Sequence, residues 1–110
     1  MFEFLEMLGN YEQRKVANYN KDGVQVDTCS VNDGRKEFET GVSHPRYNGG
    51  YWIIVACYDT REEAQAGHNE WVTKMTQPIL PESLTDIANS EVQSMVGEET
   101  FQRQPDPLMN

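Results

Sequence analysis

Basic side chains are scarce in this 110-residue sequence, which has nine lysines and arginines against eighteen acidic residues and a net charge of -9. The imbalance lies mainly in the second half, because residues 59–110 hold ten acidic and three basic side chains and contribute -7 of the total. Binding to the phosphates of DNA or RNA, or to an anionic membrane, requires clustered lysine and arginine. We therefore expect no direct nucleic-acid partner and no membrane partner, while a basic protein partner remains open.

Cysteines and long apolar runs are also few. The two cysteines, Cys29 and Cys57, are not in CxxC spacing, which argues against a disulfide framework or a zinc knuckle. The first eight residues are mostly apolar but include Glu3 and Glu6, so they are too short and too charged for a signal peptide or a membrane span. We expect the protein to stay in the cytoplasm where it is made.

Four extended segments are predicted after residue 14, near residues 15–19, 24–30, 37–44 and 51–58. They are separated by Asp-Gly pairs and an Asn-Gly-Gly run, which supply the positive φ angles that tight turns require. The second and third segments alternate apolar with polar residues, as half-buried strands do. The pattern predicts a four-stranded antiparallel meander.

The fourth segment, residues 51–58, is apolar on both sides. Trp52 and Ile54 share one face, and Ile53 and Val55 share the other. We expect water to be excluded from both faces, as in a strand at the interior of a protein. One sheet with one helix layer covers a single face, so the second face should be covered by another part of the chain or by another copy of a protein.

A helix is predicted over about residues 60–76. Thr60 followed three residues later by Glu63 forms a capping-box pattern, and Gln77-Pro78 should end the helix. The stripe expected to pack on the sheet consists of Ala64, His68, Trp71, Val72 and Met75.

Two further helices are predicted at the ends of the chain. Phe2 and Leu5, with Leu8, form one side of a short N-terminal helix that must dock on its own domain or on a neighbouring subunit. A C-terminal helix begins at Pro81 or Glu82 and packs through Leu84, Ile87, Val92 and Met95. The fold class is thus α+β, with a single domain over residues 1–97 and an extended polar tail over residues 98–110.

Two thiols and two imidazoles are the residues that could carry chemistry. Cys29, His44, Cys57 and His68 match the ligand count of a structural zinc site, but strand alternation places Cys29 and His44 on opposite faces of the sheet. Cys57 and His68 could form a nucleophilic pair, yet no orienting acid or oxyanion site lies near them in the sequence. We expect no catalytic residue, no metal and no cofactor.

The loop at residues 44–50 has the most distinctive composition. It combines Arg46 and Tyr47 with Asn48 and two glycines, a set suited to recognition on a scaffold. The alternative is structural, with Pro45 and the glycines shaping a turn and Tyr47 covering the edge of the core. If the loop binds a partner, Arg46 and Tyr47 are the residues to change.

The segment from residue 39 to residue 76 resembles small uncharacterised proteins encoded by tailed bacteriophages and prophages. This resemblance implies a viral accessory or virion component, located in the host cytoplasm or the virion, and it carries over no functional residue. It rests on His44-Pro45, Tyr47-Asn48, Gly50, Trp52, Tyr58-Asp59-Thr60, Glu62-Glu63-Ala64, Gly67-His68, Trp71-Val72 and Met75-Thr76, with residues 15–19 upstream.

Together these observations predict a non-catalytic protein that acts by protein-protein association, as a small virion or assembly component. The expected partner is the same protein in a homo-oligomer, or other virion subunits. The candidate contact residues are Arg46, Tyr47, Trp52, Phe2 and Leu5. The alternative is an acidic inhibitor that binds a host defence or nucleic-acid-handling protein through its helical half.

Overall fold

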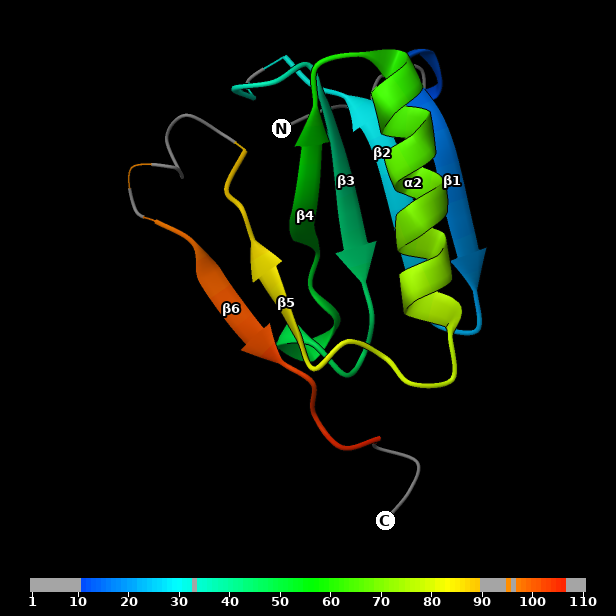
Figure 1. Cartoon of the computed structure of the whole chain (residues 1–110), viewed down its shortest axis with the longest axis vertical. Coiled ribbons are helices and arrows are strands. Elements are labelled where there is room, and N and C mark those ends of the chain that lie inside the picture. The colour runs from blue at the N-terminus through cyan, green and yellow to red at the C-terminus, as the bar shows by residue number, and fades with distance from the viewer. Residues whose placement is uncertain (1–10, 33, 90–94, 96, 107–110) are drawn as a thin grey trace.

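A computed structural model describes residues 11–106 of the chain, except residues 33, 90–94 and 96. Its main sheet contains β1 (Lys15–Lys21), β2 (Val24–Ser30), β3 (Phe38–Ser43) and β4 (Ile53–Tyr58) in that order. All neighbouring strands are antiparallel, so the predicted four-stranded meander is confirmed (Figure 1). β1 and β2 are joined by Asp22 and Gly23, which both have positive φ angles and form the tight two-residue connection that the Asp-Gly pair predicts.

The helix α2 (Arg61–Thr76) lies across one face of this sheet (Figure 1). The capping box is present, since the backbone nitrogen of Glu63 donates to the Thr60 hydroxyl and the backbone nitrogen of Thr60 donates to the Glu63 carboxylate, each at 3.1 Å. These bonds satisfy amides that the first turn leaves without partners. Gln77 caps the C-terminus in an extended conformation, so the predicted helix and both of its end signals are confirmed.

The core lies between α2 and the sheet. Ala64, His68 and Met75 of the predicted stripe are buried, and Trp71 and Val72 are partly buried. The sheet contributes alternate residues of β2 and β3 to the same layer, because paired residues on neighbouring strands share a face. These sheet residues are Val26, Thr28, Phe38, Thr40 and Val42.

β4 contains a bulge at Val55. Thr40 pairs with Ala56 and the next residue, Gly41, pairs with Ile54, so Val55 is an extra residue without a partner on β3. The alternation of side chains therefore shifts by one position after the bulge. As a result Cys57 points away from the helix, on the face opposite the core.

The prediction that water is excluded from both faces of the fourth segment is correct on one side and wrong on the other. Ile53 and Val55 are buried, with 1% and 8% of their surfaces exposed. Trp52, however, is 46% exposed, and Ile54 is half-buried. The reason is that α2 covers the first face, whereas on the opposite face the helical residues 11–14 contact Asp27 of β2 through Tyr11.

The segment expected to begin the C-terminal helix is a strand of a second, two-stranded sheet, and the expected packing residue Val92 lies outside the described residues. β5 (Ser83–Asp86) pairs antiparallel with β6 (Glu99–Gln102), and β5 lies beside β4 with β6 on its outer side (Figure 1). The backbone nitrogen of Ile87 donates to the carbonyl of Ile54 at 2.9 Å, which fixes the second sheet against the edge of the first. The segment expected to be an extended tail thus contains a paired strand at residues 99–102.

The predicted N-terminal helix over Phe2, Leu5 and Leu8 lies outside the described residues. Residues 11–14 are helical and lead directly into β1. No helix in the described part of the chain has the length and the apolar run that crossing a membrane requires.

Candidate functional site

The face of the main sheet opposite α2 carries an exposed apolar surface at its β4 end. Gly41 has no side chain, and a Cβ atom there would stand 3.2 Å from the Trp52 ring and 3.6 Å from the Ile54 side chain. The Trp52 indole and the Ile54 side chain therefore lie over the backbone of β3 at this position. We call Gly41, Trp52 and Ile54 the Trp52 surface.

A second exposed aromatic residue lies next to the Trp52 surface in the sequence. Tyr51 precedes Trp52 in the chain and is 76% exposed. Both residues follow the 3-10 turn η1 (Asn48–Gly50), which is held by a hydrogen bond from the Tyr51 nitrogen to the Asn48 carbonyl at 3.0 Å. Two adjacent exposed aromatic side chains on a rigid strand end are typical of the residues that dominate binding energy at protein interfaces.

The rest of the same face is polar and internally bonded. The Tyr11 hydroxyl donates to Asp27 Oδ1 at 2.6 Å, and Asn18 Nδ2 donates to the same oxygen at 3.1 Å. Burial, and next the bond to Asp27, raise the pKa of Tyr11 above its ordinary value. The polar groups in this corner of the face therefore bond to one another, and the Trp52 surface is the part of the face where apolar area is exposed.

The two cysteines lie on this face and are too far apart to be bonded to each other. Cys29 and Cys57 both pair with Glu39 from opposite sides, so the three residues form one row across β2, β3 and β4. The outer two are separated by about 10 Å, twice the usual strand spacing, which is too far for a disulfide. Burial, followed by the charges of Asp27 and Glu39, raises the pKa of Cys29 to about 11, so its thiol stays protonated.

The histidines lie elsewhere and do not join the cysteines. His68 is in the core layer on the opposite side of the sheet from Cys57, so the sheet separates the thiol from the imidazole of the candidate nucleophilic pair. His44 is buried beyond the end of β3, where its Nδ1 accepts a hydrogen bond from the Arg46 nitrogen at 3.0 Å. Within the described ranges, no three histidine, cysteine, aspartate or glutamate residues are grouped in a way that could hold a metal ion.

His68 is instead part of a buried chain of hydrogen bonds. Its Nδ1 lies 2.8 Å from the Thr28 hydroxyl, which lies 2.6 Å from the Thr40 hydroxyl, which in turn lies 3.0 Å from the hydroxyl of Tyr58. Burial lowers the pKa of His68, and the negative charge of Asp27 acts in the opposite direction. His68 is oriented by a threonine and differs in this from the histidine of a Ser-His-Asp triad, which an aspartate orients.

The loop at residues 44–50 binds the C-terminal part of its own chain. Tyr47 is fully buried, and its hydroxyl donates to the Pro81 carbonyl at 2.5 Å. Arg46 Nε donates to the Gln104 carbonyl at 2.6 Å, and the Gln104 nitrogen donates back to the Arg46 carbonyl at 2.8 Å. Tyr47 is therefore a core residue whose side chain is unavailable to a partner in this structure, and Arg46 is committed to β6's C-terminal extension.

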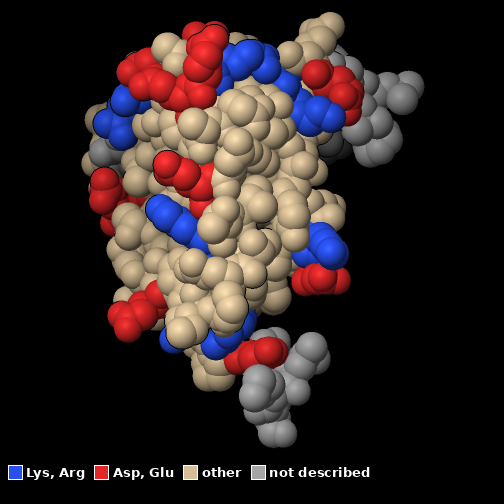
Figure 2. Space-filling model, turned by 45° about the vertical axis from the view of Figure 1, so that its right-hand side comes forward, with Lys and Arg blue, Asp and Glu red and all other residues tan. Residues whose placement is uncertain are grey.

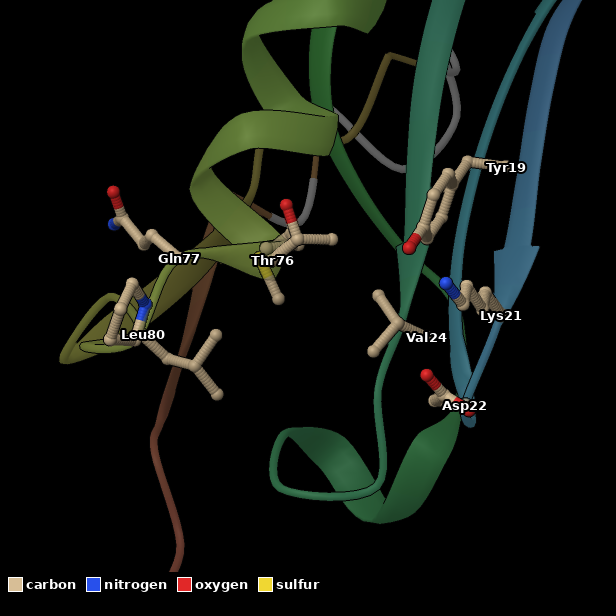
Figure 3. A pocket seen from close by; sticks show the side chains of 9 residues that line it. Tyr19, Lys21, Asp22, Val24, Thr76, Gln77 and Leu80 are labelled. Atoms are coloured by element: carbon tan, nitrogen blue, oxygen red, sulfur yellow. The ribbon is translucent and has the colours of Figure 1, made fainter.

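A shallow groove lies between the last turn of α2 and the β1–β2 hairpin (Figure 3). Its volume is about 360 Å³, its floor includes the buried side chain of Met75, and Val24 and Leu80 face it from opposite walls. Tyr19 and Lys21 of β1 stand at its rim. Lys21 favours an anionic ligand, whereas the adjacent C-terminus of α2 favours a cation, so the groove has no consistent electrostatic preference.

Acidic residues of the second half are distributed over separate elements. Glu62 and Glu63 lie in the first turn of α2, whereas Asp86 and Glu99 are paired across the second sheet. On the side where α2 and β1 come forward, charges of both signs stand mostly toward the margins around a largely uncharged centre (Figure 2). The described acidic residues therefore do not form one continuous face along the helix.

Of the candidate contact residues, Trp52 is the one that the structure exposes on an apolar surface. Phe2 and Leu5 lie outside the described residues. No family model matches this chain, and no curated protein or solved structure matches it either. The resemblance to phage proteins consequently stays a prediction.

Proposed function

We propose that this protein is non-catalytic and acts by associating with other protein subunits through the Trp52 surface. The observation that carries the proposal is the 46% exposure of Trp52, whose ring lies over Gly41 on the face of the sheet opposite α2. Tryptophan in a partly open apolar setting is strongly enriched among residues that dominate binding energy. Burying Trp52 and Ile54 against a partner would remove apolar area from water, which is the main favourable contribution to association.

The geometry of the surface also suits association with a second copy. Antiparallel sheets pack face to face in protein interiors at about 10 Å separation, and large side chains from the two inner faces fill the space between them. Trp52 and Ile54 would provide these side chains, and the glycine at position 41 leaves room for both of them to lie over β3. In the proposed setting of a phage, the associating subunits would be copies of this protein or other virion components.

Sedimentation equilibrium over a wide range of protein concentration tests the proposal. We expect the wild-type chain to form a defined oligomer, and Trp52→Ser to weaken its association by about 30-fold, since a central tryptophan contributes about 2 kcal/mol or more. Ile79→Ser is the matched control, because Ile79 is 78% exposed but lies beyond the end of α2. A wild-type chain that stays monomeric at high concentration would contradict self-association.

A second candidate function is binding of a basic protein by the second sheet. Asp86 and Glu99 are directly opposite each other on β5 and β6, and like charges in this arrangement repel. A cationic partner would relieve that repulsion, and its affinity would fall steeply with added salt. Charge reversal of Glu98 and Glu99 tests it, and binding that is insensitive to both salt and these changes would exclude this candidate.

A further inference from the structure

The buried hydrogen-bond chain joins four elements of the fold. Its members are His68 on α2, Thr28 on β2, Thr40 on β3 and Tyr58 on β4, linked by contacts of 2.8, 2.6 and 3.0 Å. Thr28 and Thr40 are completely buried. Water is therefore excluded from both hydroxyls, and the partners of each hydroxyl are the neighbouring members of the hydrogen-bond chain.

The chain has a direction, because each hydroxyl carries one hydrogen and can donate once. The phenol of Tyr58 is the most acidic of the three hydroxyls, and an imidazole nitrogen is the best acceptor among the four groups. At neutral pH the favoured direction is thus from Tyr58 to Thr40, from Thr40 to Thr28, and from Thr28 to Nδ1 of His68. His68 must then carry its own hydrogen on Nε2.

Nε2 of His68 is in contact with solvent. No hydrogen-bond partner of Nε2 is found among the described residues, where no buried side-chain nitrogen or oxygen lacks a partner, and His68 as a whole is 4% exposed. An Nε2 atom without a partner must therefore be accessible to water. The imidazole consequently has Nδ1 bonded in the dry core and a small part of Nε2 open to water.

We infer that the His68–Thr28–Thr40–Tyr58 chain is a relay that reports the protonation state of His68 at the hydroxyl of Tyr58. When His68 takes up one proton from water, both ring nitrogens carry hydrogen and Nδ1 becomes a donor. Thr28 must then donate to Thr40, and Thr40 must donate to Tyr58. The hydrogen of Tyr58 loses its acceptor in the chain and turns to solvent, while no bond between heavy atoms changes.

The relay ends at a contact between the helix and the sheet. Gly67 lies directly against the Tyr58 ring and hydroxyl, so little space separates α2 from β4 there. The charged and titratable groups that act on the two ends are Asp27 for His68, and Glu70 and Cys57 for Tyr58. None of these three residues belongs to the hydrogen-bond chain, so the link between its two ends runs through the two threonine hydroxyls.

Nuclear magnetic resonance of the whole chain tests the relay. We expect the ¹⁵N shifts of His68 to show the Nε2–H tautomer at neutral pH, and the ring carbon bearing the Tyr58 hydroxyl to shift on acidification with the same midpoint as His68. In Thr40→Val, His68 should still titrate, and the accompanying shift of Tyr58 should be lost. The exposed Tyr51 is the internal control and should show no step at that midpoint.

Three results would overturn the inference. The first is an Nδ1–H tautomer of His68 at neutral pH, since the chain would then already run toward Tyr58. The second is a Tyr58 signal that does not follow His68 in the wild-type chain. The third is a Tyr58 step that persists in Thr40→Val, which would indicate a through-space effect. The first two tests use the unaltered protein, so they do not depend on the folding of the variant.

Discussion

Substitution of Gly67 by alanine should destabilise this protein, although alanine is the better helix former. Gly67 is buried on the sheet side of α2, and a Cβ atom there would overlap the hydroxyl, Cε1 and Cζ atoms of Tyr58. Tyr58 cannot move away freely, because its hydroxyl is bonded to Thr40 at 3.0 Å and its ring lies between the helix and the sheet.

The expected change in the free energy of unfolding is the sum of one stabilising and two destabilising contributions. Replacing glycine by alanine within a helix contributes about 1 kcal/mol of stability. Overpacking a filled core costs roughly 1–3 kcal/mol, and displacing the Tyr58 hydroxyl from Thr40 costs about 1 kcal/mol more. We therefore expect Gly67→Ala to lower the free energy of unfolding by about 2 kcal/mol.

Urea denaturation followed by circular dichroism measures this change. Ala66→Gly is the matched control, since Ala66 is the exposed neighbour on the same helix and should lose only about 1 kcal/mol. The double variant with Gly67→Ala and Tyr58→Leu should lose less free energy of unfolding than the sum of the losses in the two single variants. A Gly67→Ala variant that is as stable as the wild-type chain, or more stable, would refute the packing described for α2 and β4.

Three other predictions concern the cap, the loop and the histidines. Thr60→Ala removes the capping box and should cost about 1 kcal/mol in urea denaturation, and no loss would show that the cap is dispensable. Tyr47→Phe leaves the Pro81 carbonyl without its donor and should cost about 1–2 kcal/mol with an unchanged fold, whereas a neutral effect would contradict the burial of Tyr47. Burial lowers the pKa of both His44 and His68 below 6.5, so protons bind more tightly to the unfolded chain. The stability that the neutral histidines contribute should hence be fully present above pH 6.5 and be lost as the pH falls below it. A free energy of unfolding that increases on acidification would contradict this pH dependence.

Local signals in the sequence were sufficient to predict the main sheet and its helix. The Asp22-Gly23 pair predicts the β1–β2 connection because both residues tolerate positive φ. Thr60 and Glu63 predict the start of α2 because their contacts span only three residues. Features of this kind depend on neighbouring residues alone, so they can be predicted without tertiary information.

The bulge at Val55 could not be predicted from the pattern. It adds one residue to an apolar run in which every position looks alike, and it reverses the side chain directions that follow. Strict alternation would put Cys57 on the face of Ile53, whereas the structure puts it on the face of Ile54. The separation of Cys57 from His68 depends on this single register shift.

The second sheet was also missed for a tertiary reason. Leu84 and Ile87 are three residues apart, a spacing that fits a helix. They form or follow β5 because β6 pairs with it from residues 99–102 and the Ile87 nitrogen bonds to Ile54 on β4. The burial of Tyr47 agrees with the structural alternative for its loop, but the segment that buries it, around Pro81, is distant in the sequence and could not be identified from it.

The exposure of the Trp52 surface at low and high protein concentration is the most direct test of the proposed association. A water-soluble paramagnetic probe broadens the signals of surface residues, and its effect can be compared for Trp52, for Ile54 and for Lys21 at the distant groove. We expect Trp52 and Ile54 to become protected as the concentration rises while Lys21 stays exposed. Equal broadening of Trp52 at all concentrations, in a chain that nevertheless oligomerises, would show that another surface is used and would contradict association through the Trp52 surface.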